Sequence, residues 1–485
     1  VARFMRRIMQ RLVAGHLPAQ SVRVVARHGR HLRCRHGFEQ AFGTAPLHCV
    51  VPGQPARMLS LHPARKRKKH GPRSPLKVGL AIAGGGPIGG MYELGALRAL
   101  DEALDGIDLT RLDCYVGVSS GAFLAAGLAN RISTEEMCRG FITGTSDDIS
   151  FRPDTFLRPN VGEYLRRMAR IPELSLSWTK RFLSHPGRAL RWSEIMTRFG
   201  GLVPTGLFDN RAVEHFLRDT FSRRGRSNDF RTLGADLFVV AVDLDSGEAV
   251  RFGEPGWDAV PISQAVQASA ALPGLYPPVE INGRHFLDGA LRRTMHASTV
   301  LERGIDLMIG INPLVPFDAS RAPRQSGEAD QIGLAGGGLP SVLSQTLRTM
   351  LQSRMQIGME KYPHLYPDID QLVFEPNAGD SELFFTNLFS FSARQRVCEL
   401  AYRNTLADLR ARAAELRPVL AAHGIRLREE ILADEGRSIL DSLPPPPPRS
   451  TETTARLRPA LDDADRLVDG ARKPRRRTRS RRTLV

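Results

Sequence analysis

A serine pentapeptide stands between an apolar run and a segment of small residues. Residues 117–121 read Gly-Val-Ser-Ser-Gly and directly follow the apolar residues 114–116. Residues 122–128 are rich in alanine and have the composition of a helix that packs closely. A nucleophilic serine on a sharp strand-to-helix turn needs this context, because flanking glycines let neighbouring backbone pass without a Cβ clash. The pattern predicts an α/β chain with Ser119 on the turn.

Short apolar strands alternate with helical patterns in the middle of the chain. Strand-like runs occupy residues 78–83, 114–118, 237–242, 250–252, 279–281 and 307–311. Helical spacing of apolar residues follows the first two runs and recurs at about 261–272. Strands that alternate with helices form a mainly parallel sheet covered on both faces. We therefore expect a three-layer α/β/α fold.

The composition divides the 485 residues into four segments. Residues 1–75 are basic and rich in histidine, and we expect them to lie outside the fold. Residues 76–312 form the α/β domain, with an arginine-rich and aromatic cap inserted at about 141–210. Residues 313–440 form a helical C-terminal extension packed on that domain, with helices at 341–360 and 392–417 after a Gly/Ala/Ser-rich loop. Residues 441–485 form a proline-rich linker and a basic tail, because prolines in series stay extended.

The net charge of +17 belongs to the two ends of the chain. Residues 1–77 carry 17 Lys and Arg against one acidic residue, and residues 444–485 carry 12 against 5, so the part between them is mildly acidic. Basic ends attract polyanions without sequence preference. The basic ends are either solvated tails or segments that contact an anionic membrane. A cationic amphipathic helix at residues 5–13 would strengthen such a membrane contact. No specific nucleic acid is expected.

Five scattered cysteines form no metal-ligand spacing and no disulfide pattern, which indicates a reducing compartment. The sequence has no apolar run of eighteen residues and no apolar segment followed by a secretory cleavage site. We therefore expect a cytoplasmic protein, peripheral at a membrane if its basic ends bind lipid.

A glycine loop follows the first strand. Residues 84–89 read Gly-Gly-Gly-Pro-Ile-Gly, which satisfies the dinucleotide-binding pattern G-x-G-x-x-G. The next strand ends without the carboxylate that would hold a ribose, and no Lys-Ser/Thr pair follows to make a phosphate loop. What remains is a nest of backbone N–H groups at a helix N-terminus, which beside a nucleophilic serine would form an oxyanion hole.

The serine needs a base, and an aspartate is better placed than any histidine. After Ser119, histidines stand at positions 185, 215, 285, 296, 364 and 423, and none follows a late strand where an α/β-hydrolase triad would have it. Asp288 ends a strand-like run and is followed by Gly289-Ala290. A free aspartate, with a pKa of about 3.9, is a weak base, but burial would raise that pKa. A turn-forming Asp-Gly remains the alternative.

The order of these motifs resembles the patatin-like phospholipases. The resemblance covers residues 78–312 and extends more loosely to about 410, and residues 268–279 resemble the segment before the family's catalytic aspartate. It implies hydrolysis of lipid acyl esters by a Ser-Asp dyad, without a metal or a cofactor. The motif residues that carry it are Gly84, Gly86, Gly89, Gly117, Gly121, Gly289 and Ala290.

Carried onto this chain, the resemblance makes Ser119 the nucleophile and Asp288 the proton acceptor. The amides of Gly84, Gly85 and Gly86 would hold the oxyanion. One residue departs from the family pattern: Ile88 stands where Arg or Lys usually follows the glycine triplet. Without that cation a phospholipid preference is less secure than esterase chemistry.

Three functions remain open from the sequence. The first is hydrolysis of a lipid or fatty-acyl ester, by the dyad or by a Ser-His-Asp triad. The second is acyl transfer by the same dyad to an acceptor other than water. The third is a non-catalytic adaptor that binds a membrane or another polyanion through its basic ends.

Overall fold

The computed structural model describes residues 23–25, 31–33, 59–65, 76–146, 149, 158–169, 205–316, 338–377 and 391–443. The chain divides into two compact units, residues 1–55 and 56–485. In the first unit, β1 (Arg23–Val25) pairs antiparallel with β2 (His31–Arg33). The expected amphipathic helix at 5–13 and the basic tail at 444–485 lie outside the described residues.

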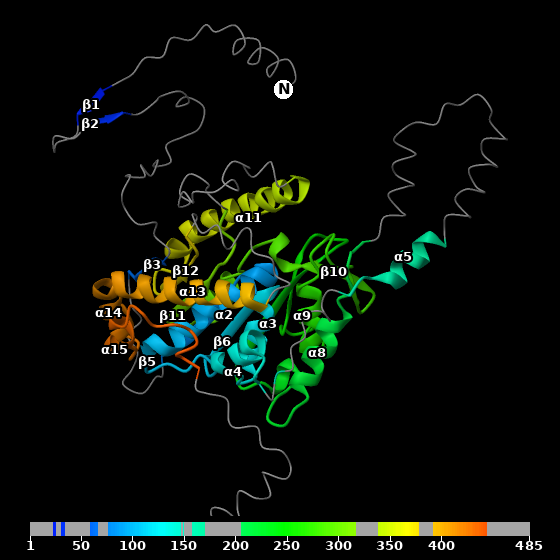
Figure 1. The fold of residues 1–485 in the computed structure, drawn as a ribbon, viewed down its shortest axis with the longest axis horizontal. Helices are drawn as coiled ribbons and strands as arrows, with labels where there is room; N and C mark the ends of the chain where they lie inside the picture. Colours follow the sequence, from blue (N-terminus) through cyan, green and yellow to red (C-terminus); the bar gives the residue numbers. More distant parts are fainter. Residues whose placement is uncertain are drawn as a thin grey trace, which may run out of the picture. The chain divides into compact units, whose positions relative to one another are not determined.

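The second unit is built on one large sheet (Figure 1). Each strand is hydrogen-bonded to the next in the order β3 (Leu59–His62), β12 (Asp370–Phe374), β11 (Leu307–Ile311), β4 (Val78–Ile82), β6 (Cys114–Val118), β7 (Asp236–Asp243), β10 (Arg284–Asp288) and β9 (Val279–Ile281), and β8 (Ala249–Phe252) is also paired to β7. The strands from β12 to β7 are parallel, and the others pair antiparallel. The expected mixed α/β class with a mainly parallel sheet is confirmed.

Strand β7 brings two other strands end to end. Its first part pairs with β6 up to Val118↔Val240, and its last part pairs with β10 from Asp288↔Ala241 onward. Strand β8 pairs with residues 239–242 of β7 and overlaps both partners, so it occupies the opposite side. Therefore β6 and β10 lie on the same side of β7, and their C-terminal ends meet.

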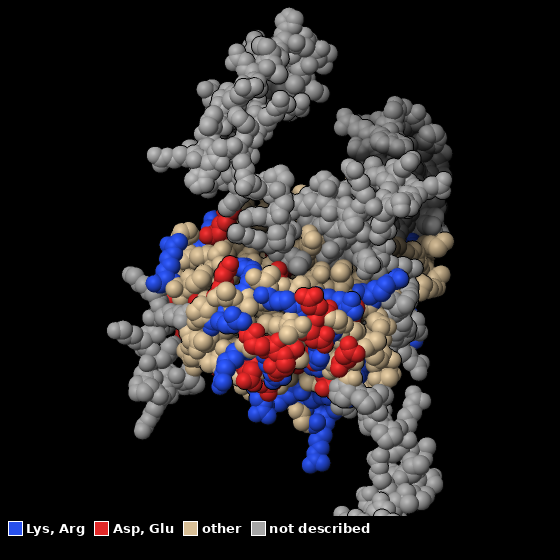
Figure 2. All heavy atoms as spheres, turned by 60° about the vertical axis from the view of Figure 1, so that its left-hand side comes forward, with Lys and Arg blue, Asp and Glu red and all other residues tan. Residues whose placement is uncertain are grey.

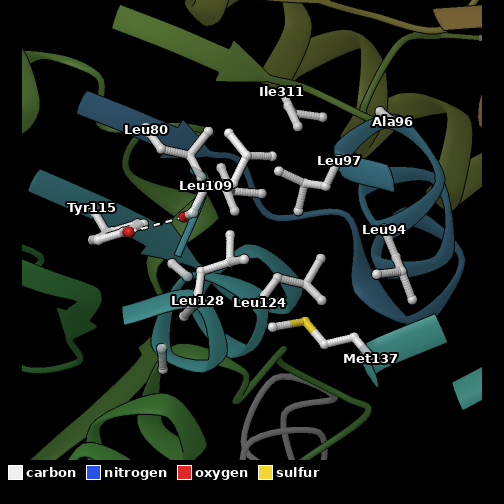
Figure 3. Close-up of a cluster of buried hydrophobic side chains, with 14 of the residues drawn as sticks. Leu80, Leu94, Ala96, Leu97, Leu109, Tyr115, Leu124, Leu128, Met137 and Ile311 are labelled. Atoms are coloured by element: carbon white, nitrogen blue, oxygen red, sulfur yellow. Dashed lines mark hydrogen bonds between the residues drawn. The ribbon is translucent and has the colours of Figure 1, made fainter. Parts of the chain in front are cut away.

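Alternate residues of the strands enter two separate cores. Leu80, Tyr115 and Ile311 belong to the larger one, with helices α2 (Gly86–Ala103), α3 (Ser120–Ala129), α8 (Arg211–Phe221), α9 (Ile262–Ser269) and α13 (Phe391–Ala411). Figure 3 shows Leu97 and Leu124 packed there, and the hydroxyl of Tyr115 donating to the carbonyl of Leu109 at 2.9 Å. Their sequence neighbours, including Ala81 and Val116, pack on the other face with α10 (Ser298–Leu301) and α11 (Gly338–Leu365). The sheet thus lies between two helical layers.

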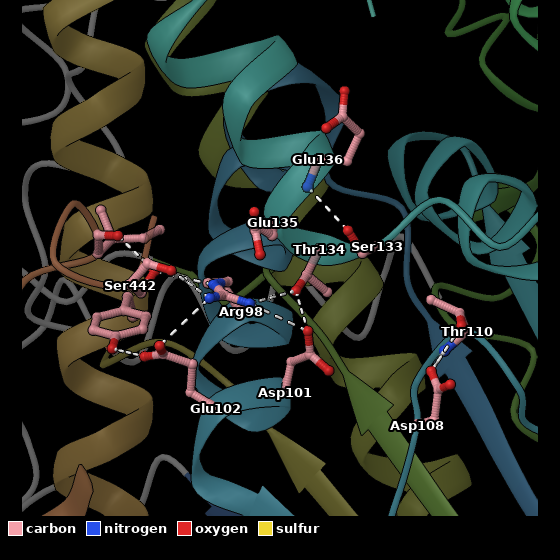
Figure 4. A network of polar contacts seen from close by, with 12 residues as sticks. Arg98, Asp101, Glu102, Asp108, Thr110, Ser133, Thr134, Glu135, Glu136 and Ser442 are labelled. Carbon is pink, nitrogen blue, oxygen red and sulfur yellow. Dashed lines mark hydrogen bonds and ion pairs between the residues drawn. The ribbon is translucent and has the colours of Figure 1, made fainter. Parts of the chain in front are cut away.

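The C-terminal residues pack on α2 through a buried polar network (Figure 4). The guanidinium of Arg98 donates to the Oγ of Ser442 at 3.0 Å and to its carbonyl oxygen at 2.5 Å. It also forms ion pairs with Asp101 and Glu102 on its own helix, and Arg437 binds Glu102 at 3.0 Å. These contacts hold residues 437–442 against the α/β domain. Further along, α14 (Ala413–Ala421), β13 (Arg426–Leu427) and α15 (Glu429–Ala433) complete this region, and β13 pairs with β5 (Leu104–Asp105).

Two strands fall outside the expected segments of the sheet. Strand β3 lies within the segment 1–75 and forms the edge of the sheet beside β12, which lies within the C-terminal extension. Leu59 and Leu61 alternate with polar residues over only four positions, too short a pattern to stand out among arginines and histidines. The sheet therefore includes residues on both sides of the proposed boundaries at 76 and 312.

The structure describes the cap only in part. Residues 139–143 form a π-helical turn after α4 (Thr134–Cys138), and α5 (Val161–Met168) has no buried residue. The rest of the cap, and most of the loop expected at 318–340, lie outside the described residues. None of the helices that the structure describes combines the length and the apolar character needed to cross a membrane. On the face in Figure 2, acidic and basic side chains are interspersed over the coloured residues, in keeping with the weak net charge of the middle of the chain.

Candidate active site

Ser119 stands in a strained conformation between β6 and α3. Its φ of 52° and ψ of −120° lie where residues with a side chain are rarely found. The turn also demands its glycines: a Cβ on Gly117 would lie 2.4 Å from the Cα of Ala122, and one on Gly121 would lie 2.4 Å from the carbonyl oxygen of Ala83. A sharp strand–turn–helix with a strained serine at its tip is the geometry of a nucleophile elbow.

Asp288 ends strand β10 and is 2% exposed. Its carboxylate accepts the N–H of Ala290 at 2.9 Å. Burial raises the pKa of Asp288 from 3.8 to about 6, and hydrogen bonds with the Ser119 side chain and the Ala290 N–H partly offset that rise. The following Gly289 is required, because a Cβ there would lie 2.2 Å from the carbonyl oxygen of Val240. A carboxyl with this pKa is ionised at neutral pH and is a stronger base than a free aspartate.

The glycine loop lies against the turn of Ser119 and the turn that follows Asp288. A Cβ on Gly84 would lie 3.0 Å from the Cβ of Ser119 and 3.1 Å from the Cβ of Ala290. The structure therefore brings the three sequence motifs together: the glycine triplet, the serine elbow and the Asp-Gly-Ala turn. Gly84 is the contact point, and a Cβ there would make contacts tighter than side chains usually make.

The amides of the glycine loop differ in what they bind. The N–H of Gly84 donates to the carbonyl of Thr294 at 3.0 Å, and the N–H of Gly85 donates to the Oγ of Ser120 at 2.9 Å. Gly86 has a φ of +62° and begins α2, and its N–H makes no hydrogen bond to a described residue. The helix N-terminus adds a partial positive charge at this point. Among the three glycine amides, that of Gly86 is therefore the one without a hydrogen-bond partner in the described part of the chain.

Ile88 occupies an apolar place. It is half-buried and packs against the larger core, at the position where the family usually has a cation. In this chain an apolar contact of Ile88 holds the loop at the position of that cation.

The histidines at positions 285, 296, 364 and 423 lie in settings unlike that of a catalytic base, and His185 lies outside the described residues. His285 and His364 are exposed, and the side chain of His423 binds Asp370 at 2.7 Å at the opposite, N-terminal end of β12. His296 is near the site, with its Nε2 3.4 Å from the carbonyl oxygen of Gly289. Burial lowers the pKa of His296 to about 3, so this ring is neutral.

Ser269 is a site residue that the sequence did not single out. Its Oγ accepts the N–H of Ser119 at 2.8 Å and donates to the carbonyl of Val240 at 2.6 Å. It thereby fixes the backbone of the strained serine to β7. Ser269 lies in the segment 268–279 that carries part of the family resemblance, which was the available indication.

The fold and the turn together define an α/β protein with a serine at a strand–turn–helix elbow. Residues 80–301 match the family model of the patatin-like phospholipases. The family assignment made from the three motifs is confirmed.

Several solved structures show a distant similarity to the chain. VipD from Legionella pneumophila is 17% identical with a TM-score of 0.26, over 54% of this chain and 55% of VipD. Human GIVD cytosolic phospholipase A2 is 11% identical with a TM-score of 0.31, over 72% of this chain and 63% of the human protein. ExoU of Pseudomonas aeruginosa, in complex with SpcU, is 15% identical with a TM-score of 0.23, over 88% of this chain and 87% of the matched chain. The chain thus spans less than two thirds of the first two proteins.

Proposed function

We propose that the chain is a serine lipid acyl hydrolase, a carboxylic ester hydrolase in which Ser119 and Asp288 form a catalytic dyad. The observation that carries this proposal is the pairing of a strained serine with a buried aspartate whose pKa is raised to about 6. A base with a pKa near the working pH accepts a proton efficiently and can return it later. The neutral, buried His296 supports a dyad over a Ser-His-Asp triad.

The reaction follows from these positions. Ser119 Oγ attacks the ester carbonyl while the carboxylate of Asp288 takes the hydroxyl proton. The carbonyl oxygen becomes an oxyanion, which the N–H of Gly86 and the N-terminus of α2 stabilise. Collapse of the tetrahedral intermediate breaks the ester bond, and Asp288 returns the proton to the leaving alcohol. Water, activated by Asp288, then releases the fatty acid and restores Ser119.

An aromatic cluster beside α3 is our candidate for the acyl-chain site. Phe123, one turn after Ser119, has its ring centroid 5.4 Å from that of Phe141 and 5.7 Å from that of Phe216. These rings line a small apolar hollow together with Gly127, Ile132, Met137, Ile149, Leu217, Thr220 and Phe221. Phe141 and Ile149 belong to the expected cap, which supports the interpretation of the cap as part of the acyl pocket.

Helix α5 is our candidate for contact with the lipid surface. Val161, Leu165 and Met168 recur at helical spacing and are 55–62% exposed. Arg158 and Arg166 are exposed beside them. An apolar helix face flanked by arginines suits the boundary of an anionic bilayer.

Short backbone contacts connect α5 to the catalytic aspartate. The N–H of Asn160 binds the carbonyl of Leu207, and the N–H of Leu207 binds the carbonyl of Gly274, each at 3.1 Å. Three residues before Gly274, the carbonyl of Ala271 accepts the N–H of Asp288 at 3.0 Å. Backbone hydrogen bonds therefore connect α5 to the segment that holds Asp288. A lipid bound at α5 would be on the side of the domain from which it could reach the dyad.

Product analysis with mixed micelles tests the function and separates hydrolysis from acyl transfer. With a diacyl phospholipid or a diacylglycerol, we expect the wild type to release free fatty acid and Ser119→Ala to release none. A lysolipid acceptor added in excess would collect the acyl group if the enzyme is an acyltransferase. Absence of both products with each lipid class would contradict the proposal.

A further inference from the structure

A buried glutamate that the reaction does not use stands next to the nucleophile elbow. Glu93 lies in α2 and is fully buried. Burial raises its pKa well above the ordinary 4.5, although a hydrogen bond from Ser120 partly offsets the rise. A buried carboxyl is costly, so its retention in an otherwise apolar helix interface calls for a specific contact.

That contact is a relay through Ser120, the residue that follows the nucleophile. The Oγ of Ser120 donates to the Oε1 of Glu93 at 2.9 Å and accepts the N–H of Gly85, also at 2.9 Å. One hydroxyl thus joins the glycine loop, the first turn of α3 and the second turn of α2. Its proton and one of its two lone pairs are used, and these two hydrogen bonds fix the orientation of the hydroxyl.

The loop has little freedom to move away from this relay. A Cβ on Gly85 would lie 2.4 Å from the Cγ of Pro313, 2.6 Å from the Cα of Gly89 and 3.2 Å from the Oε1 of Glu93. Packing therefore holds one side of Gly85, and the hydroxyl of Ser120 holds its N–H. The neighbouring amide, that of Gly86, is left without a partner among the described residues.

We propose that Glu93 and Ser120 form a clamp that fixes the glycine loop in register with the nucleophile. The clamp consumes the N–H of Gly85 and directs the N–H of Gly86 towards the carbonyl that Ser119 attacks. Both are positioning residues, since neither reaches the reacting atoms. This inference rests on the proposed function of Ser119, which it extends to the way the oxyanion donor is held.

The protonated acid suffices for this role. The Oε1 of Glu93 acts only as an acceptor towards Ser120, and the Oε2 has no hydrogen-bond partner in the part of the chain that the structure describes. A glutamine has the same shape and keeps the accepting oxygen. A leucine removes it, and Ser120→Ala leaves the N–H of Gly85 without its acceptor.

The test measures kcat and KM for a short-chain nitrophenyl ester in the full chain, with hydrogen exchange over residues 84–90. We expect Glu93→Leu and Ser120→Ala each to lower kcat by about 10- to 100-fold, within the range for loss of an oxyanion donor, with KM changed less than about threefold. Glu93→Gln should keep kcat within about threefold of wild type. The double variant Glu93→Leu/Ser120→Ala should be no slower than the worse single variant, because both break one unit. Exchange over residues 84–90 should rise in both single variants and not in Glu93→Gln.

Asp408 supplies the matched control. It is another carboxyl whose pKa burial raises to about 6, and it lies on α13 away from the loop. Asp408→Leu should leave kcat unchanged whatever it does to stability.

The clamp is overturned if Ser120→Ala keeps wild-type kcat and wild-type exchange over residues 84–90, or if Glu93→Gln is as slow as Glu93→Leu. Should Glu93→Leu fail to fold, Ser120→Ala and Glu93→Gln still decide. Failure of the proposed function looks different, because the wild type itself would then leave the ester intact. In that case unchanged loop exchange in Ser120→Ala overturns the clamp as well, and faster exchange supports it.

Discussion

Ser119 directly follows β6 and Asp288 ends β10, two strands that meet end to end on one side of β7. Val118, just before the serine, pairs with Val240, and Asp288 pairs with the next residue of β7, Ala241. The proximity of the two side chains is therefore set by strand register within a buried sheet. A one-residue slip of either strand would turn its side chains to the other face and separate them.

Removing either member of the dyad should abolish ester hydrolysis. We expect Ser119→Ala and Asp288→Asn each to lower kcat/KM for a short-chain nitrophenyl ester by about 10³-fold or more, since each removes a group on which every turnover depends. His285→Ala and His364→Ala should stay within about twofold of wild type, and His296→Gln within about tenfold. If one histidine change is as damaging as Ser119→Ala, the base is a histidine.

The activity should be lost in acid with a midpoint near pH 6. Asp288 accepts a proton only when ionised, and burial raises its pKa to about 6. The rate should therefore be low below pH 5, rise through pH 6 and be level above pH 7. The pH dependence of kcat/KM measures this directly. A midpoint near pH 4 would mean that Asp288 is not desolvated in the working enzyme.

The same burial of Asp288 should lower the stability of the folded protein at neutral pH. With a pKa raised from 3.8 to about 6, the folded state binds the proton more tightly than the unfolded state. The penalty is absent below pH 3.8, where both states are protonated, grows up to pH 6 and is then constant at about 3 kcal/mol. The free energy of unfolding of Asp288→Asn, measured with urea, should therefore rise relative to that of wild type as the pH increases from 4 to 8. A difference that does not change with pH would refute this account.

Gly84 should tolerate no side chain. A Cβ at this position would lie 3.0 Å from the Cβ of Ser119 and 3.1 Å from the Cβ of Ala290, so Gly84→Ser must shift the serine elbow or the Asp-Gly-Ala turn by a few tenths of an ångström. We expect a loss of about 100-fold or more in kcat, with about 1–3 kcal/mol of destabilisation from overpacking. Gly162→Ala, where a Cβ meets open space, is the control. Activity of Gly84→Ser near the wild-type level would show that the three motifs do not meet there.

Charge on the exposed face of α5 should separate lipid from soluble substrates. Leu165→Asp places a carboxylate where we propose that the helix meets a bilayer, so hydrolysis of anionic vesicles should fall about tenfold or more. The short-chain ester should be hydrolysed as by wild type, because α5 does not touch the dyad. Leu440→Asp, at another exposed leucine in the C-terminal region, is the matched control. Equal rates on vesicles for the two variants would remove α5 from the lipid surface.

Local patterns predicted much of the fold and the site. The elbow, the glycine loop and Asp288 could be found because each depends on neighbours in sequence: a strand, a glycine turn and a following helix or turn. The class of sheet followed from the same alternation of elements. Strand β3 could not be predicted, because it has only four residues and its partner, β12, lies about 300 positions later in the sequence.

The partners of the loop amides could not be predicted for a related reason. The N–H of Gly85 binds Ser120, which is 35 positions away, and the N–H of Ser119 binds Ser269, which is 150 positions away. No pattern within either segment records such a contact. Glu93 reads in sequence as one polar residue of a helix, and only the packing of α2 against α3 shows that it is buried and tied to the elbow.

The most direct test of the central claim is covalent labelling by a fluorophosphonate, followed by intact-mass measurement and peptide mapping. The phosphonate reacts with an activated serine and mimics the tetrahedral intermediate. We predict one adduct per chain, on Ser119, absent in Ser119→Ala and formed at least about 100-fold more slowly in Asp288→Asn. An unlabelled wild type, or an adduct that persists in Ser119→Ala, would contradict the assignment of Ser119 as the nucleophile.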